Sequence, residues 1–234
     1  MRLHDILSEG INDKGIFKCV FLGGVPASGK SYIANEIMRN TGVMPKTVNF
    51  DQFYEYLSQK HEVPIKTKSD TDSPEAHDIR QRAKTLTRSQ VQVYLRGMLP
   101  LIVDTTASDI AQLVERMSVL REHGYDILMV YKKSKMDVAM QRAAARSRYV
   151  DPVHIKRMHS SEDYRIYEIE KYLKEKGNHF ILLEPDQQIS DVVREIDKFY
   201  TSPIENPIGI KTKNELLGSQ EKVTPTPTNV HKWY

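Results

Sequence analysis

The chain has 234 residues, of which 39% are hydrophobic and 28% charged, and its formal net charge at pH 7 is +3. These values fit one sizeable globular domain with short appendages, and the small charge does not by itself indicate nucleic-acid binding. The chain has one cysteine, Cys19, which excludes an internal disulfide. No stretch approaches the roughly 18 apolar residues of a membrane span, and the first residues lack the apolar core of a signal peptide. We therefore expect a cytoplasmic protein with no membrane partner.

A phosphate-binding loop follows the first apolar run of the chain. Residues 16–22 read Ile-Phe-Lys-Cys-Val-Phe-Leu, which predicts a strand, and residues 31–39 have the pattern of a helix. Between them, Gly24 to Ser31 spells G-x-x-x-x-G-K-S, in the strand–loop–helix context that this motif requires. Glycines let backbone N–H groups turn toward an anion, and the start of the helix adds its positive end. We expect Lys30 to reach the β- and γ-phosphates of ATP and Ser31 to ligate Mg²⁺. The residues expected to bind the nucleotide are Gly24, Val25, Pro26, Ala27, Ser28, Gly29, Lys30, Ser31 and Tyr32.

Strands and helices alternate along the rest of the chain. The expected strands are 46–50, 100–104, 125–131 and 179–183, and the expected helices are 52–59, 75–98, 108–123, 135–146, 153–174 and 190–200. In the helix 52–59, the side chains of Phe53, Tyr56 and Leu57 are expected to point inward. This alternation predicts an α/β protein of the P-loop NTPase fold, with a five-stranded parallel sheet and helices on both faces.

The composition divides the chain into three parts. We expect an N-terminal extension over 1–14, one domain over 15–200 and an irregular C-terminal tail over 201–234. The tail is rich in proline, has few large apolar residues and shows no hydrophobic period.

Polar residues follow the second and third expected strands, where an open parallel sheet binds its ligands. Asp51 is placed to accept a proton from an attacking hydroxyl; alternatively, it caps the helix that begins after it. Asp104 is placed to help Lys30 and Ser31 hold Mg²⁺; alternatively, it is a strand-end residue that makes only local turn contacts. Thr105 and Thr106 follow it at the same strand end. No run of four apolar residues is followed by Asp-Glu, the arrangement with which many ATP hydrolases activate water. This favours transfer to a hydroxyl over hydrolysis.

A basic segment over residues 132–159 holds eight Lys and Arg residues against two acidic ones. Arg142 and Arg146 stand four residues apart on one helical face, just before a break near Pro152. Guanidinium groups stabilise the charge that spreads over the γ-phosphate during transfer, and a lid closing over ATP excludes water. We expect an arginine-bearing helical lid over about 141–155; the alternative is a solvated helix face.

Several motifs together resemble the P-loop kinases of the polynucleotide kinase and zeta-toxin group over roughly residues 16–160. They are G-G-V-P-A-S-G-K-S, V-N-F-D-Q-F, L-I-V-D-T-T and M-Q-R-A-A-A-R-S-R-Y-V-D-P. The resemblance implies that Asp51 is the catalytic base, that Asp104 and Thr105 line the substrate side, and that Arg142 or Arg146 contacts the phosphates of ATP. In those families an arginine commonly follows the base by three positions, and here Tyr54 stands there. We assign Tyr54, Arg82 and Thr106 to the substrate side as well.

The sequence thus predicts an ATP- and Mg²⁺-dependent kinase that phosphorylates a hydroxyl. The first expected acceptor is a 5′-hydroxyl of DNA or RNA, and the alternative is a nucleotide-sugar, as in zeta-toxin-like enzymes. A second alternative is a non-catalytic nucleotide-binding regulatory module, which keeps the phosphate-binding loop but does not need Asp51.

Overall fold

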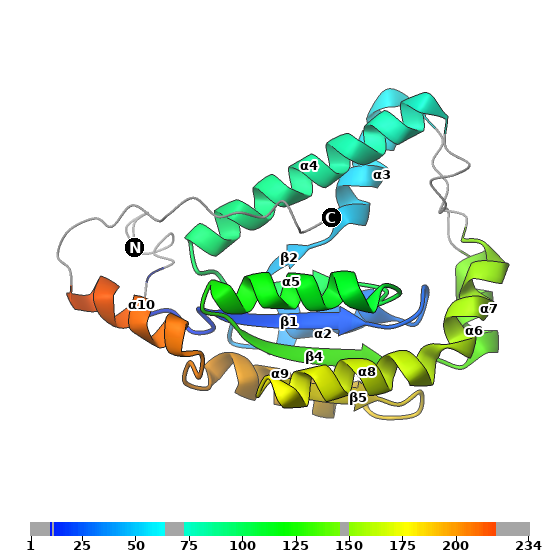
Figure 1. The fold of residues 1–234 in the computed structure, drawn as a ribbon. Helices are drawn as coiled ribbons and strands as arrows, with labels where there is room; N and C mark the ends of the chain where they lie inside the picture. Colours follow the sequence, from blue (N-terminus) through cyan, green and yellow to red (C-terminus); the bar gives the residue numbers. More distant parts are fainter. Residues whose placement is uncertain (1–9, 11, 64–72, 146–149, 219–234) are drawn as a thin grey trace.

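Strands and helices alternate through the chain in a computed structural model that describes residues 10, 12–63, 73–145 and 150–218 (Figure 1). The strands are β1 (Lys18–Gly23), β2 (Lys46–Val48), β3 (Leu101–Asp104), β4 (Asp126–Lys132) and β5 (His179–Leu183). The helices are α2 (Lys30–Asn40), α3 (Phe50–His61), α4 (Pro74–Arg96), α5 (Ile110–Glu122), α6 (Met136–Ala144), α7 (Pro152–Ser160), α8 (Glu162–Glu175), α9 (Ile189–Thr201) and α10 (Pro207–Gly218). Within these described ranges, no helix is both long enough and apolar enough to cross a membrane.

The sheet has five parallel strands in the order β2-β3-β1-β4-β5, which confirms the predicted α/β architecture. The central strand β1 pairs with β3 on one side and β4 on the other, so that Leu22 lies beside Asp104 and Val130. The chain therefore leaves β1 at the point where the strand order reverses, and ligands of open α/β sheets bind outside the carboxyl ends of the strands at this point.

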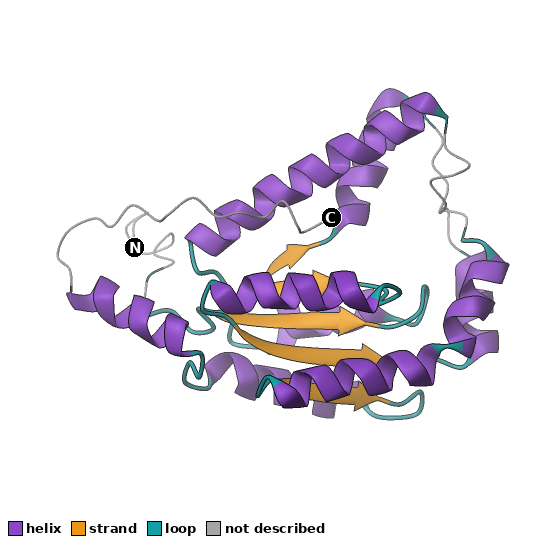
Figure 2. Ribbon diagram, in the orientation of Figure 1, coloured by secondary structure: helices purple, strands orange, loops and turns teal. Residues whose placement is uncertain are grey.

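Two hydrophobic cores lie on opposite faces of the sheet, because successive side chains of a strand alternate in direction. Cys19 and Phe21 of β1 belong to the core covered by α4, α5 and α8. Val20 and Leu22 belong to the core covered by α2 and α9. Figure 2 shows helices around the strands of the sheet. The predicted helices on both faces are thus confirmed. Cys19 is fully buried, and burial raises the pKa of its thiol well above the usual value.

Helices α3 and α4 form a pair beside β2. Helix α3 begins at Phe50, two residues earlier than expected, because the Asn49 side chain accepts a hydrogen bond from the backbone N–H of Asp51. Tyr54 and Leu57 pack against α4, whereas Tyr56 is exposed. The expected inward position of Tyr56 is therefore wrong, since the aromatic side chain that meets α4 comes two residues earlier.

The segment after α9 is not irregular throughout, which corrects the expected tail. Pro207–Gly218 form α10. The Asn206 side-chain oxygen accepts a hydrogen bond from the backbone N–H of Ile208 at 2.9 Å, and Pro207 follows as the first helical residue. An Asn-Pro pair of this kind is a helix-start signal that the proline-rich composition obscured.

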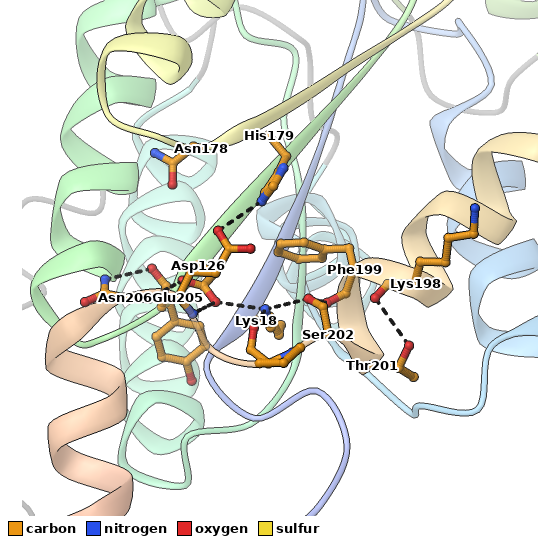
Figure 3. A network of polar contacts seen from close by, with 12 residues as sticks. Lys18, Asp126, Asn178, His179, Lys198, Phe199, Thr201, Ser202, Glu205 and Asn206 are labelled. Atoms are coloured by element: carbon orange, nitrogen blue, oxygen red, sulfur yellow. Dashed lines mark hydrogen bonds and ion pairs between the residues drawn. The ribbon is translucent and has the colours of Figure 1, made fainter.

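A buried ion pair fixes this segment to the amino ends of the strands (Figure 3). Lys18 Nζ lies 2.8 Å from Asp126 Oδ2 and also donates to Ser202 Oγ at 2.9 Å. The Asp126 carboxylate accepts from the backbone N–H groups of Glu205 and Asn206 at 2.9 and 2.7 Å. Charged groups taken out of water need such complete pairing, so β1, β4 and the start of α10 are held together at this edge.

Close contact between two glycines should make the docking of α10 sensitive to a single methyl group. A Cβ on Gly209 would overlap the carbonyl oxygen of Gly124, whereas a Cβ on Gly218 of the same helix would meet open space. We expect Gly209→Ala to lower the free energy of unfolding by about 1–3 kcal/mol, the usual cost of forcing extra volume into a tight contact. Gly218→Ala is the matched control in urea denaturation. Equal stability of the two variants would contradict the docking of α10 on Gly124.

Candidate active site

The loop between β1 and α2 has the turned backbone that its motif predicts. Gly24 has φ +142°, and a Cβ there would overlap the carbonyl oxygen of Lys132. Ala27 is held at φ +64°, in the left-handed region, where a side chain costs free energy and is tolerated mainly at functional sites. No side chain caps α2 at Gly29. The N–H groups of the first turn of α2 therefore face the loop without a side-chain acceptor, which suits an anion.

Lys30 connects this loop to the neighbouring strand β3. Its ammonium group is buried and donates hydrogen bonds to the carbonyl oxygens of Gly24 and Val25 at 2.9 and 3.3 Å. The same Nζ lies 3.9 Å from Oδ1 of Asp104. Asn49 Nδ2 donates to the other carboxylate oxygen of Asp104 at 3.3 Å. A chain of polar contacts thus leads from the phosphate-binding loop to the start of α3.

Asp51 stands in the first turn of α3, at the carboxyl end of the sheet. Asn49, and not Asp51, is the N-cap of this helix, since its Oδ1 accepts from the Asp51 N–H at 2.9 Å. The capping alternative for Asp51 is therefore wrong. Through its backbone N–H, Asp51 therefore joins the series of polar contacts that runs from Lys30 through Asp104 and Asn49.

Thr105 and Thr106 form the turn after β3. The backbone N–H of Thr105 donates to the Leu22 carbonyl at 3.0 Å, and its hydroxyl accepts from the backbone N–H of Ala107 at 3.0 Å. The Thr106 hydroxyl donates to the Ser108 hydroxyl at 3.1 Å. Both threonines therefore make local turn contacts next to Asp104.

Tyr54 and Arg82 lie away from this polar chain. Tyr54 is fully buried, and its hydroxyl accepts a hydrogen bond from Arg80 at 2.9 Å while the Arg80 guanidinium lies 4.6 Å from its ring centroid. A substrate contact by Tyr54, as assigned from the sequence, does not fit this burial; Tyr54 packs the two helices together. Arg82 lies on the exposed side of α4, with Nη1 3.4 Å from His61 Nε2 and 4.0 Å from the Asp78 carboxylate.

Helices α6 and α7 pack directly against the phosphate-binding loop. Their apolar side chains share one cluster with two residues of the loop; the buried members are Val25, Ala27, Ala139, Ala143, Val150, Ile155 and Met158. Arg142 Nη1 donates to the Ser28 carbonyl oxygen at 3.4 Å. Arg146 lies outside the described residues. The structure thus brings Arg142, one of the two arginines predicted for a lid, to the loop.

A pocket of about 520 Å³ opens between the loop, α6 and the segments that follow β4 and β5. Its walls include Tyr32, Arg142 and Gln187. Lys132 closes one side and donates to the Glu184 carbonyl at 3.0 Å. Burial lowers the pKa of Lys132, and the nearby positive charge of Arg142 lowers it further.

Sequence reasoning missed several of these residues. Asn49 is recognisable as an N-cap residue one position before an aromatic helix start. Lys132 ends β4, and the segment Asp186–Gln187 follows β5, so the same rule that pointed to Asp51 and Asp104 applies to them.

The available donor groups suit Mg²⁺ bound together with phosphates. The Ser31 hydroxyl and the Asp104 carboxylate offer the oxygen ligands that Mg²⁺ prefers, and this cation is commonly held by one or two carboxylates plus substrate phosphates. Among the described residues, no group of three or more His, Cys, Asp or Glu side chains could hold a metal without them.

Three comparisons relate the chain to known proteins. The family model AAA_33, described as an AAA domain, matches residues 20–162, and a comparison with curated proteins finds no match. A "putative kinase" from Chloroflexus aurantiacus J-10-fl superposes with a TM-score of 0.57 at 12% identity, covering 78% of this chain and 97% of that chain. A chain of the Pnkp1/Rnl/Hen1 RNA repair complex superposes with a TM-score of 0.51 at 19% identity, covering 67% of this chain and 47% of that chain. At such identities the likeness shows a shared fold.

Proposed function

Because the chain belongs to the AAA_33 family of AAA domains, we propose that its phosphate-binding loop holds ATP and that the protein transfers the γ-phosphate to a hydroxyl group. The observation that carries this proposal is the polar chain from Lys30 through Asp104 and Asn49 to the start of α3. Lys30 at the start of α2, Asp104 at the end of β3 and Asp51 in the first turn of α3 lie at one edge of the sheet, which supports the proposal. A nucleotide-binding module without catalysis would not need the second carboxylate, Asp51.

The transfer follows from the roles of these side chains. Asp51 accepts the proton of the acceptor hydroxyl while the hydroxyl oxygen bonds to the γ-phosphorus, and the bond from that phosphorus to the bridging oxygen breaks to release ADP. Lys30 and Arg142 stabilise the negative charge on the phosphate oxygens, with Arg146 of the lid as a second guanidinium. Mg²⁺ held by Ser31 and Asp104 would neutralise part of the charge on the β- and γ-phosphates.

The acceptor in this proposal is a 5′-hydroxyl of DNA or RNA. The fold is shared with a chain of an RNA repair complex, and the basic segment 132–159 carries eight Lys and Arg residues against two acidic ones. Positive charge beside the site favours a polyanionic acceptor. A nucleotide-sugar remains the alternative acceptor that the sequence resemblance implies.

The test is transfer of labelled γ-phosphate from ATP to a panel of acceptors. We expect labelling of an oligonucleotide with a 5′-hydroxyl and none of the same oligonucleotide already carrying a 5′-phosphate. Labelling of a nucleotide-sugar instead would establish the alternative acceptor. ATP binding without transfer to any acceptor would contradict the kinase function and favour the regulatory module.

A further inference from the structure

The pocket beside the phosphate-binding loop lies on the other side of β1 from Asp51 and Asp104. In the strand order β2-β3-β1-β4-β5, Asp104 ends β3 and Asp51 follows β2, whereas two walls of the pocket come from the end of β4 and the segment after β5. Figure 1 shows α6, another wall, at the end of the sheet toward which β1 and β4 point. Because the phosphate-binding loop forms part of the pocket, phosphates bound to the loop leave the rest of the pocket to the nucleoside of the donor.

Lys132, the last residue of β4, stands where several walls of this pocket meet. Its side chain is buried, and Nζ donates to the carbonyl oxygens of Glu184 and Pro185 at 3.0 and 3.5 Å. Its own carbonyl oxygen lies so close to Gly24 that a Cβ on this glycine would overlap it. Lys132 therefore touches the phosphate-binding loop with its backbone and the segment after β5 with its side chain.

The segment after β5 is a turn over residues 184–187. It lines the pocket with Pro185, Asp186 and Gln187. The turn closes on itself, because the backbone N–H of Gln187 donates to the Glu184 carbonyl at 3.2 Å and the Glu184 N–H donates to Gln187 Oε1 at 3.3 Å. Lys135 holds the turn through an ion pair with Asp186 at 3.1 Å, but both side chains are exposed, and exposed pairs contribute little. Lys132 provides a buried attachment of the turn to β4.

The partners of Lys132 differ from those of the other buried lysines in the described residues. Lys18 and Lys30 lie beside the carboxylates of Asp126 and Asp104, whereas the ammonium group of Lys132 donates to backbone carbonyl oxygens. A buried ammonium group costs free energy unless its hydrogens are bonded, and hydrogen bonds from a charged donor are stronger than neutral ones. The ammonium group and the turn over residues 184–187 therefore hold each other in place.

We infer that Lys132 is a positioning residue for the donor nucleotide: it holds the turn over residues 184–187 against the pocket, and the turn binds the nucleoside. This inference rests on the proposed kinase function and adds a determinant of donor affinity outside the phosphate-binding loop. The phosphates meet the loop, Lys30 and Arg142, while the nucleoside meets the turn. The two halves of the donor should therefore respond differently when Lys132 is replaced.

Equilibrium binding tests the inference without depending on catalysis. The probes are ATP and inorganic tripolyphosphate, which carries the phosphates but no nucleoside, each with Mg²⁺. We expect Lys132→Met to weaken ATP binding by about tenfold, because the loss of a charge-assisted hydrogen bond lowers the fraction of protein whose turn is ready to bind. The affinity for tripolyphosphate should stay within about twofold of wild type, as for an independent site. Lys132→Arg keeps a positive charge and N–H donors, so it should recover part of the affinity for ATP.

Transfer kinetics separate positioning of the donor from the chemical step. Lys132→Met should raise the KM for ATP with little change in kcat, the pattern expected when binding is lost equally in the ground state and the transition state. Lys171→Met is the matched control, because it removes the same side-chain charge at an exposed position of α8. It should leave both affinities and both kinetic constants at their wild-type values. The melting temperature of each variant confirms that it folds.

Two outcomes would overturn the inference. One is an equal loss of affinity for ATP and tripolyphosphate in Lys132→Met, which would place the effect at the phosphates. The other is an ATP affinity of Lys132→Met equal to that of Lys171→Met; transfer by the wild type would then keep the kinase and reject the role of Lys132. A selective loss of ATP binding in Lys132→Met, without transfer by the wild type to any acceptor, would keep that role and reject the kinase. Failure of the wild type to bind ATP would reject both.

Discussion

Replacing Lys30 with alanine is expected to lower kcat/KM for phosphoryl transfer by about 10³-fold, the scale seen when a preorganised charge donor is removed from a transition state. The Lys30 ammonium group is buried, fixed by the carbonyl oxygens of Gly24 and Val25, and lies 3.9 Å from the Asp104 carboxylate. Its loss removes the positive charge that meets the phosphates. It also leaves the negative charge of Asp104 beside them, so both effects act in the same direction.

Steady-state transfer of labelled phosphate and equilibrium binding of ATP measure this effect. Lys171→Ala on α8 serves as the control, because that lysine is exposed on the helix layer outside the sheet. Retention of wild-type activity by Lys30→Ala would show that the phosphates of ATP bind elsewhere.

Asp51→Asn should reduce kcat by about 10²–10⁴-fold, the usual contribution of a positioned general base. Asparagine keeps the shape of the side chain but cannot accept the proton of the acceptor hydroxyl. The helix start should survive the change, because the cap of α3 is supplied by Asn49 and only the backbone N–H of Asp51 takes part in it. We therefore expect the melting temperature and the affinity for ATP to stay close to those of the wild type.

Asp109→Asn provides the matched control for Asp51→Asn. Asp109 also follows a strand end and caps α5 by accepting from the Gln112 N–H at 3.0 Å, so the substitution removes the same charge at the same edge of the sheet. Equal losses of kcat in the two variants would indicate a general charge effect and reject Asp51 as the base. A loss confined to Asp51→Asn agrees with the proposed proton transfer.

The sequence predicts the phosphate-binding loop and the parallel sheet, because both follow from local sequence patterns. The phosphate-binding loop needs only its own glycines and its strand and helix, and alternating strands and helices give the parallel sheet. Asp51 and Asp104 were predicted because the first follows the expected strand 46–50 and the second ends the expected strand 100–104. These inferences require no knowledge of which helix covers which surface.

The features that sequence missed depend on contacts between distant segments. Tyr54 and Tyr56 both fit an amphipathic helix, and only the position of α4 decides that Tyr54 is buried. Helix α10 has a weak hydrophobic pattern, and its place depends on Gly124 and Asp126, about 80 residues earlier in the chain. Local propensity is a weak guide where tertiary contacts determine the outcome.

The reactivity of Cys19 can be used to measure how often the central sheet of the protein opens. Cys19 is the only thiol of the chain, and it lies fully buried in the central strand, the strand that leads into the loop that would hold ATP. A thiolate is the reactive form, so a buried thiol with a raised pKa reacts with an alkylating reagent only when β1 separates from the sheet. The alkylation rate therefore measures how often the sheet opens. A ligand that binds only the closed protein should lower the alkylation rate. The rate should fall by a factor of one plus the ratio of the free ligand concentration to the Kd of the ligand.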